Sequence, residues 1–395
     1  MRLIITTWIL FALLLTGCTT ASPSTQNLIP TSMSVPTLTA QPPTSTPIPT
    51  TLPETPTPTP LPNAIPMEEL NTSLFHFYEG NPVLPHSGNI KWDAIYIDPG
   101  AMLYRDGLFH MFFNGINGFP APIGVGYATS PDGYHWTRQV SEPVLRATQL
   151  RNSKLLGSNL FVTSVLVEAD GTWVLYFYTL TGGTFNGPGD IGRATAPSAT
   201  GPWTIDPDPV LSPGSIGTWD DVQVTAPDVH KTDDGYVMYY DGHGNGTTSM
   251  IGMASSSDGI HWTKYNDAAT TDSAFAESDP VLTVSQEGWD STRVIDPNVI
   301  QTSDGWIMVY LATTGSGKFS GNDFSFGAAS STDGIHWTKN VQNPILSNKD
   351  HPQWLGTYLA TLLQVENTYF LYFDFVSPDA KGTNVYMATY SGLLK

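Results

Sequence analysis

Residues 234–263 read DGYVMYYDGHGNGTTSMIGMASSSDGIHWT, and this stretch contains the pattern on which the fold depends. Asp234-Gly235 is a turn sequence, and the run after it, Tyr236–Gly242, is rich in residues that favour strands. A second turn sequence, Asp258-Gly259, leads to His261-Trp262-Thr263. Because Asp-Gly between apolar runs indicates a hairpin, the stretch predicts consecutive antiparallel strands.

The same pattern recurs along residues 67–395. Turn sequences precede aromatic runs at Asp106-Gly107, Asp170-Gly171, Asp234-Gly235, Asp304-Gly305 and Glu366-Asn367. A Pro-Val-Leu signature, with Ile in the last copy, begins at Pro82, Pro143, Pro209, Pro280 and Pro344. The His-Trp-Thr ending follows at His135, His261 and His336, and Gly201-Pro202-Trp203-Thr204 is a variant of it. Four strands in a repeat of about 65 residues predict one propeller blade per repeat.

We therefore expect an all-β fold, a five-bladed β-propeller. The last repeat ends without a His-Trp strand, whereas Phe75-His76-Phe77 before the first repeat nearly copies that strand. We expect this N-terminal strand to complete the last blade and to close the ring, which would leave few free strand edges. The recurring His and Trp residues are interpreted as structural, since repeated identity indicates packing.

The residues before the repeats predict export and a membrane tether. Residues 1–18 combine Arg2, an apolar run and Leu15-Thr16-Gly17-Cys18, which resembles a bacterial lipobox. Lipid on Cys18 would anchor the protein at the cell surface. Residues 19–66 hold 13 Pro and 13 Thr in 48 positions, which predicts a disordered stalk. The propeller domain is expected over residues 67–395.

Composition excludes several classes of function. The formal net charge of −19 repels nucleic acid. Cys18 is the only cysteine, so the repeats hold no disulfide, cysteine zinc site or cysteine nucleophile. We expect a monomer that binds carbohydrate and contacts a membrane only through its lipid.

Three inner strands are expected to begin with a shared motif. Trp-Asp precedes Ile97-Asp98-Pro99, Thr225-Ala226-Pro227 and Ile295-Asp296-Pro297. Five such blades resemble the arabinanase, xylosidase, invertase and levansucrase propellers of glycoside hydrolase families 43, 32 and 68, and also the mannoside phosphorylases of family 130. The resemblance covers nearly all of residues 72–395, and it implies catalysis by acids that meet in a central funnel.

In those hydrolases one Asp is base or nucleophile, a second orients and tunes, and a Glu is general acid. The resemblance places the first on Asp98, whereas the other two fall on Ala226 and Ile295, so the standard triad is not intact. Asp228 lies two residues beyond Ala226, and Asp296 adjoins Ile295. The predicted catalytic set is Asp98, Asp296 and Asp228, because glycosidic cleavage needs paired carboxylates in opposite protonation states.

Other residues are predicted to bind substrate. Aromatic rings can stack on sugars, and polar side chains near the funnel can contact hydroxyl groups. The predicted set is Trp92, Tyr96, Trp219, Trp289, His230 and Asp241, the last in a Gly-rich segment expected to form a loop over the funnel mouth. The acids after the three tryptophans are interpreted as turn or capping residues: Asp93, Asp220 and Asp290.

Three functions stay open at this point. The first is a glycosidase acting on external oligo- or polysaccharides. The second is a non-catalytic sugar-binding propeller, which the mismatches at Ala226 and Ile295 favour. The third, a sialidase-like protein, is suggested by Ser130-Pro131-Asp132-Gly133 but disfavoured because the arginines share no common blade position. No cofactor is required; a calcium ion, which occurs in some relatives, is the one metal considered.

Overall fold

The computed structural model describes residues 76–88, 91–118, 121–181, 187–244, 248–302, 305–314, 324–347, 359–376 and 382–391. Cys18, the lipobox and the Thr/Pro-rich stretch lie outside the described residues. The described part is nearly all β. Its helices are two short 3-10 turns, η2 (Ala147–Asn152) and η3 (Ser273–Phe275). No helix among the described residues is long and apolar enough to cross a membrane.

The strands form five antiparallel groups, here called sheets 1 to 5, each with a long first, second and third strand. Sheet 1 holds β2 (Tyr96–Arg105), β3 (Leu108–Ile116), β4 (Gly124–Ser130), β5 (Thr137–Arg138) and β6 (Leu145–Arg146). Sheet 2 holds β7 (Asn159–Val167), β8 (Trp173–Leu180), β9 (Ile191–Ala196) and β10 (Thr204–Ile205).

Sheets 3 and 4 repeat the same order. Sheet 3 holds β11 (Gln223–Thr232), β12 (Gly235–His243), β13 (Ser249–Ser256), β14 (Thr263–Lys264) and β15 (Pro280–Leu282). Sheet 4 holds β16 (Arg293–Thr302), β17 (Gly305–Thr313), β18 (Phe324–Ser331), β19 (Thr338–Lys339) and β20 (Leu346–Ser347). A single parallel pair, Ser249 with Arg293, links these two groups into one ten-stranded sheet.

Sheet 5 joins the two ends of the described chain. It holds β21 (Ala360–Val365), β22 (Thr368–Val376), β23 (Thr383–Ser391) and β1 (His76–Phe77). The N-terminal strand β1 pairs antiparallel with β23, with His76 opposite Thr389 and Phe77 opposite Ala388. The strand expected from Phe75-His76-Phe77 thus lies beside the last strand of the chain, at the position that β5 and β10 occupy in their sheets.

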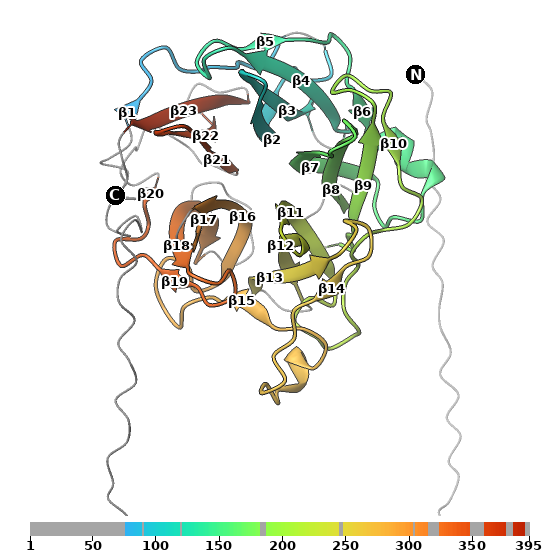
Figure 1. Ribbon diagram of the computed structural model, residues 1–395, viewed down its shortest axis with the longest axis vertical. Helices are drawn as coiled ribbons and strands as arrows, with labels where there is room; N and C mark the ends of the chain where they lie inside the picture. The colour runs from blue at the N-terminus through green and yellow to red at the C-terminus, as the bar shows by residue number, and fades with distance from the viewer. Residues whose placement is uncertain are drawn as a thin grey trace, which may run out of the picture. The chain divides into compact units, whose positions relative to one another are not determined.

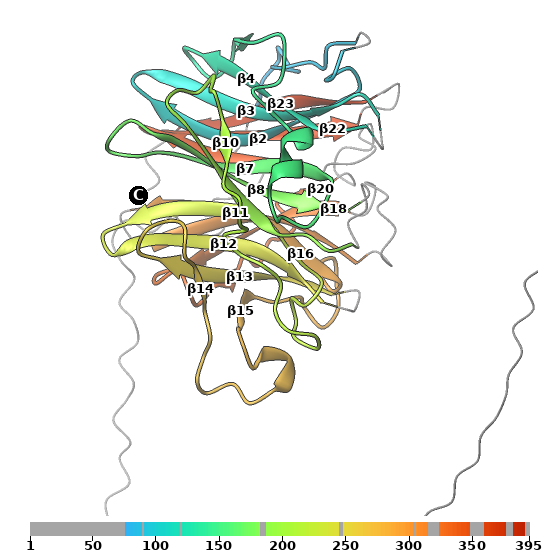
Figure 2. The same cartoon turned by 90° about the vertical axis from the view of Figure 1, so that its right-hand side faces the viewer.

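The first strands β2, β7, β11, β16 and β21 lie on the inner side of their sheets (Figure 1). Each contacts the first strand of the next sheet, and β21 contacts β2. Figure 2 shows the sheets from the side, with η3 in a segment that projects between β14 and β15.

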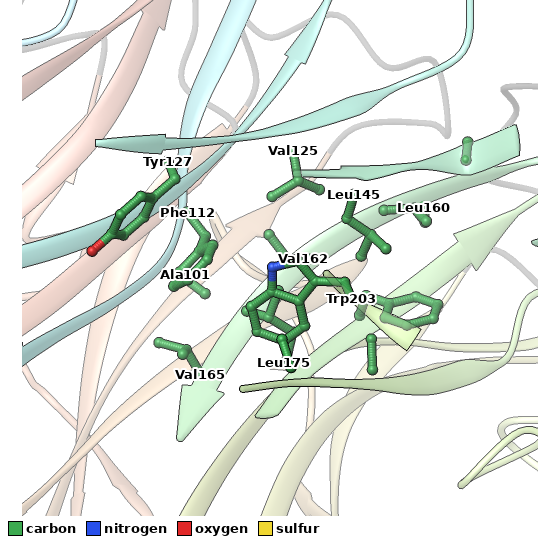
Figure 3. Packing of buried hydrophobic residues seen from close by; sticks show 14 of the residues in the cluster. Ala101, Phe112, Val125, Tyr127, Leu145, Leu160, Val162, Val165, Leu175 and Trp203 are labelled. Carbon is green, nitrogen blue, oxygen red and sulfur yellow. The ribbon is translucent and has the colours of Figure 1, made fainter. Parts of the chain in front are cut away.

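Aromatic and branched side chains fill the spaces between neighbouring sheets. Phe112 of β3, Val162 of β7 and Trp203 belong to one buried cluster between sheets 1 and 2 (Figure 3). Similar clusters lie between each later pair, and one unites Phe109 and Phe370 of sheets 1 and 5. Burial of this apolar area is the main favourable term for such a fold.

The repeated Asp-Gly turns receive hydrogen bonds from tyrosines of the preceding sheet. Tyr176 of β8 donates to the Gly259 carbonyl at 2.7 Å, and Tyr239 of β12 donates to Gly334 at 2.9 Å. Tyr372 of sheet 5 donates to Gly133 of sheet 1 at 2.9 Å. The recurring turns therefore serve the packing between sheets.

Candidate functional site

One position on every second strand lies at the same level of the fold. It is the residue directly after two consecutive bulky residues, as in Tyr239-Tyr240-Asp241. The five residues at this position are Asn114, Tyr178, Asp241, Leu311 and Asp374. Cross-strand pairing sets three of them opposite the motif residues of the first strand: Asn114 opposite Asp98, Asp241 opposite Thr225, and Leu311 opposite Ile295.

Asp98 lies on β2 just before an irregularity in the pairing with β3. Its Oδ1 accepts hydrogen bonds from Asn114 Nδ2 at 2.8 Å and from the Gly100 amide at 3.1 Å. Gly100 has φ +53°, and a Cβ there would lie 2.1 Å from the Phe112 carbonyl oxygen, so only glycine fits this bend. Burial raises the pKa of Asp98 to about 7, although both hydrogen bonds oppose the rise.

Asp296 lies in the corresponding irregularity of β16, where it is left out of the pairing with β17. Its φ is +50°, a left-handed conformation that residues other than glycine seldom adopt. Such conformations cost energy and occur often at functional sites. Burial raises the pKa of Asp296 well above its usual range, and the charges of Asp241, Asp98 and Asp374 raise it further.

Asp241 lies within β12, so the prediction of a loop at this position was wrong. It is buried, and Thr225 Oγ1 donates to its Oδ2 at 2.9 Å. Its Oδ1 is also buried and has no hydrogen-bond partner in the part of the chain that the structure describes. Burial raises the pKa of Asp241 to about 7, while the Thr225 hydrogen bond and the Arg293 charge act in the opposite direction.

Asp374 and Tyr178 are residues that the sequence analysis missed. Asp374 is buried on β22 and accepts a hydrogen bond from the Leu359 amide at 2.8 Å. Burial raises the pKa of the Tyr178 hydroxyl, as do the charges of Asp296, Asp98 and Asp241. The signal that could have revealed both is the repeated second-strand position, since comparing the five aromatic runs would have placed them beside Asp241.

Four carboxyl groups thus influence one another at the inner strands, and we call Asp98, Asp241, Asp296 and Asp374 the inner acid cluster. Like charges in one buried place cannot all ionise, so some members stay protonated near neutral pH. No group of three or more His, Asp or Glu among the described residues is arranged to hold a metal ion. The geometry of the inner acid cluster suits proton transfer.

Asp228 does not belong to the inner acid cluster. Its Oδ2 accepts hydrogen bonds from the Val299 amide at 2.6 Å and from His230 Nε2 at 2.9 Å. The matching residues in two other sheets, Ser164 and Asn298, likewise accept from backbone amides of the next first strand. Asp228 therefore has the contacts of a link between sheets, which does not agree with the catalytic role predicted for it.

His230 shares this structural environment. Its ring is bonded to Asp228 and packs edge-on against Trp306, with ring centroids 5.7 Å apart. These contacts point to packing between sheets 3 and 4 and give no support to the predicted substrate contact.

The three predicted sugar-binding tryptophans stack inside their own sheets. Trp92 stacks on Phe113 and Trp219 on Tyr240, and Trp289 lies on Tyr310 in the same way. The packing interpretation accounts for Trp219 and Trp289, whereas Trp92 also borders open space. Tyr96 is 36% exposed at the start of β2, two residues before Asp98, so its predicted role stays a prediction.

The acids that follow these tryptophans form ion pairs with the outermost strands. Asp93 lies 3.2 Å from Arg138, Asp220 lies 2.6 Å from Lys264, and Asp290 lies 2.6 Å from Lys339. They hold the loop before the first strand to the edge of the same sheet, which is a structural role as predicted, although through ion pairs.

Comparison with known proteins identifies the fold. No protein-family model matches the chain, and neither does any curated protein. A solved structure described as a complex of BT0996 with RGII matches with a TM-score of 0.63 at 15% identity, covering 83% of this chain and 96% of the other.

Two further solved structures are similar. One comes from work on the GH130 family of mannoside phosphorylases, described as containing hydrolases that target β-1,2 mannosidic linkages in Candida mannan. It has a TM-score of 0.59 at 19% identity and covers 80% of this chain and 93% of the other. A thermostable family-43 glycoside hydrolase has a TM-score of 0.55 at 16% identity, covering 76% and 91%. The fold is that of the propeller-type glycoside hydrolases.

Proposed function

We propose that this chain is a closed five-bladed propeller that cleaves glycosidic bonds with its inner acid cluster. The observation that carries the proposal is that Asp98 and Asp296 come from sheets 1 and 4, yet the charges of both raise the pKa of Tyr178 in sheet 2. The contacts between successive first strands, and between β21 and β2, support the closed ring.

Asp296 is suited to be the proton donor. The charges of three neighbouring acids favour its protonated form, and no hydrogen bond to its carboxyl group is found among the described residues. A carboxylic acid that stays protonated near neutral pH can protonate the leaving glycosidic oxygen. Its proton passes to that oxygen as the bond to the anomeric carbon breaks.

Asp98 is suited to be the base or nucleophile. Asn114 and the Gly100 amide both donate to its Oδ1, which stabilises the ionised form of the carboxyl group. The ionised group either takes a proton from the attacking water or attacks the anomeric carbon itself. Asp241, in place of the expected Asp228, supplies the nearby charge that keeps Asp296 protonated.

The test is hydrolysis of aryl glycosides and of plant and microbial polysaccharides by residues 67–395. We expect Asp98→Asn and Asp296→Asn each to lower kcat by at least about 100-fold, in line with the loss of an acid–base group. Asp228→Asn is the matched control and should retain activity. Equal losses in all three variants, or full activity in Asp98→Asn, would remove the basis of this mechanism.

A second candidate function is sugar binding without catalysis. It is favoured by the two apolar residues, Ala226 and Ile295, at positions where the resembled hydrolases have acids; both are buried. Calorimetry with the same polysaccharides distinguishes the two functions, since a binding protein would give heat of binding with no reducing ends released, and Asp98→Asn would leave that heat unchanged.

We also propose that the protein is an exported lipoprotein that acts as a monomer outside the cell. The lipobox at Leu15–Cys18 and the long Thr/Pro-rich stretch support this placement. In cells fed radiolabelled palmitate, the wild-type protein should carry label and Cys18→Ser should not. Label in the Cys18→Ser protein would refute the anchor.

A further inference from the structure

A polar cavity lies beside Trp92, far along sheet 1 from the inner strand. Its volume is about 360 Å³, and its lining includes Ser87, Trp92, Asp93, Arg138 and Gln139. That volume is at the lower end of the range for small-molecule sites. Arg138 belongs to β5, the outermost strand of its sheet, whereas Asp98 belongs to the innermost one. The cavity is therefore separate from the inner acid cluster.

Sheet 4 shows how this local structure looks when all its polar groups are paired. The Ser285 amide donates to the Asp290 carbonyl at 3.3 Å, and Lys339 Nζ reaches both Asp290 Oδ2 at 2.6 Å and Ser285 Oγ at 3.3 Å. The serine hydroxyl, the acid and the cation thus satisfy one another within the protein.

Sheet 1 has the same backbone arrangement with a different cation. The Ser87 amide donates to the Asp93 carbonyl at 3.0 Å, matching Ser285 and Asp290. Arg138 replaces the lysine, and its Nη2 lies 2.6 Å from the Pro85 carbonyl oxygen and 3.2 Å from Asp93. The guanidinium is drawn away from the serine, so the arginine does not complete the network as Lys339 does.

Two buried polar atoms are left without partners as a result. Ser87 Oγ and Arg138 Nε are both buried and have no hydrogen-bond partner within the described ranges. Leaving such groups unpaired costs about 1–3 kcal/mol each, so native proteins usually satisfy them with water or a ligand. Both residues line the same cavity.

Trp92 gives the cavity an aromatic wall. One side of its ring stacks on Phe113, with centroids 5.6 Å apart and planes 18° apart, and its Nε1 donates to the Ser141 carbonyl at 3.2 Å. The ring also borders a second hollow of about 250 Å³, lined in part by Asn117 and Arg146. A fixed indole between two hollows can contact successive units of one chain-like ligand.

We infer that this cavity is a second, non-catalytic binding site for a neutral sugar unit of an oligosaccharide. A sugar hydroxyl can accept from Arg138 Nε and can also donate to or accept from Ser87 Oγ, which satisfies both unpaired atoms. The apolar C–H face of a sugar suits the indole of Trp92. The inference does not require turnover, so it stands or falls separately from the proposed hydrolysis.

The test uses residues 67–395 carrying Asp98→Asn and Asp296→Asn, so that the sugars stay intact. The probes are xylohexaose, arabinohexaose and mannohexaose, followed by calorimetry and by the indole N–H signal of Trp92 in NMR spectra. We expect at least one hexaose to bind and to shift that signal. Adding Arg138→Lys, which recreates the paired arrangement of sheet 4, should weaken this binding at least tenfold, and adding Ser87→Ala should do the same.

Lys339→Arg is the matched control, since it makes the reverse exchange in sheet 4, and it should leave binding at Trp92 unchanged. Melting temperatures show whether each variant is folded. Three results would overturn the inference: no hexaose shifts the Trp92 signal, binding is indifferent to both Arg138→Lys and Ser87→Ala, or crystals soaked in the binding sugar hold only ordered water in the cavity.

Discussion

The carboxyl group of Asp98 couples the site to protein stability. Its pKa is about 7 in the folded protein against 3.8 ordinarily, so between pH 4 and 7 the folded state holds a proton that the unfolded state releases. Stability is therefore greatest below pH 4 with respect to this group and is lost as the pH rises to 7. We expect Asp98→Asn to raise the melting temperature more at pH 8 than at pH 4.5, by at most about 4 kcal/mol in free energy. Calorimetric scans at both pH values check this, and a larger gain at pH 4.5 would contradict it.

Asp228 lends itself to a test of whether a carboxylate is structural. Asn retains an oxygen that can accept from the Val299 amide, whereas Ala leaves that buried amide unpaired. We expect Asp228→Ala to lower the free energy of unfolding by about 1–3 kcal/mol. Asp228→Asn should cost less than half as much and preserve activity. Urea unfolding of both variants measures the difference, and an inactive but fully stable Asp228→Asn protein would return Asp228 to the catalytic set.

At the scale of the element, each Trp-Asp motif fastens the start of a first strand to the edge of its own sheet. The Asp220 side chain is fully buried and the Lys264 side chain is 14% exposed, so the pair is largely shielded from water. Breaking such a pair from one side leaves a buried charge without compensation. We expect Lys264→Met to destabilise the protein by about 3–5 kcal/mol. The double variant Asp220→Asn/Lys264→Met should recover much of that loss in a double-mutant cycle; additive losses would argue against a coupled pair.

At the scale of the whole molecule, the N-terminal segment is tied to the last strand. Asn81 Nδ2 donates to the Met387 carbonyl and Asn81 Oδ1 accepts from the Met387 amide, both at 2.8 Å. Asn343 makes the same pair of bonds to Ala328, at 2.9 Å each, but only 15 residues away in the sequence. The two asparagines are therefore matched in chemistry and differ in what they join.

We expect Asn81→Ala and Asn343→Ala each to cost about 1–3 kcal/mol of stability. Asn81→Ala should speed hydrogen exchange in β1 and β23 at the two ends of the described chain, whereas Asn343→Ala should do so in β18. Amide exchange followed by mass spectrometry locates the change. Unaltered exchange in β1 and β23 would mean that the ends are not held together in this way.

The local chemistry of the chain was enough to predict the repeated strands, their Asp-Gly turns and the structural character of the recurring His and Trp residues. These depend on short-range rules, since a turn sequence and an alternating apolar run act within a few residues of each other. The same reasoning selected Asp98, Asp296 and Asp241 as candidates, because acids are rare in apolar strands.

Only the tertiary structure separated Asp228 from those acids and brought in Asp374. In the irregular part of each first strand the alternation of side chains is interrupted, so spacing along the sequence does not say which way an acid points. Asp228 is drawn to an amide of the next sheet, while Asp374 is joined to the cluster by strands far away in the chain. Burial and like-charge interactions depend on such distant neighbours, so the protonation of the acids is a property of the assembled fold.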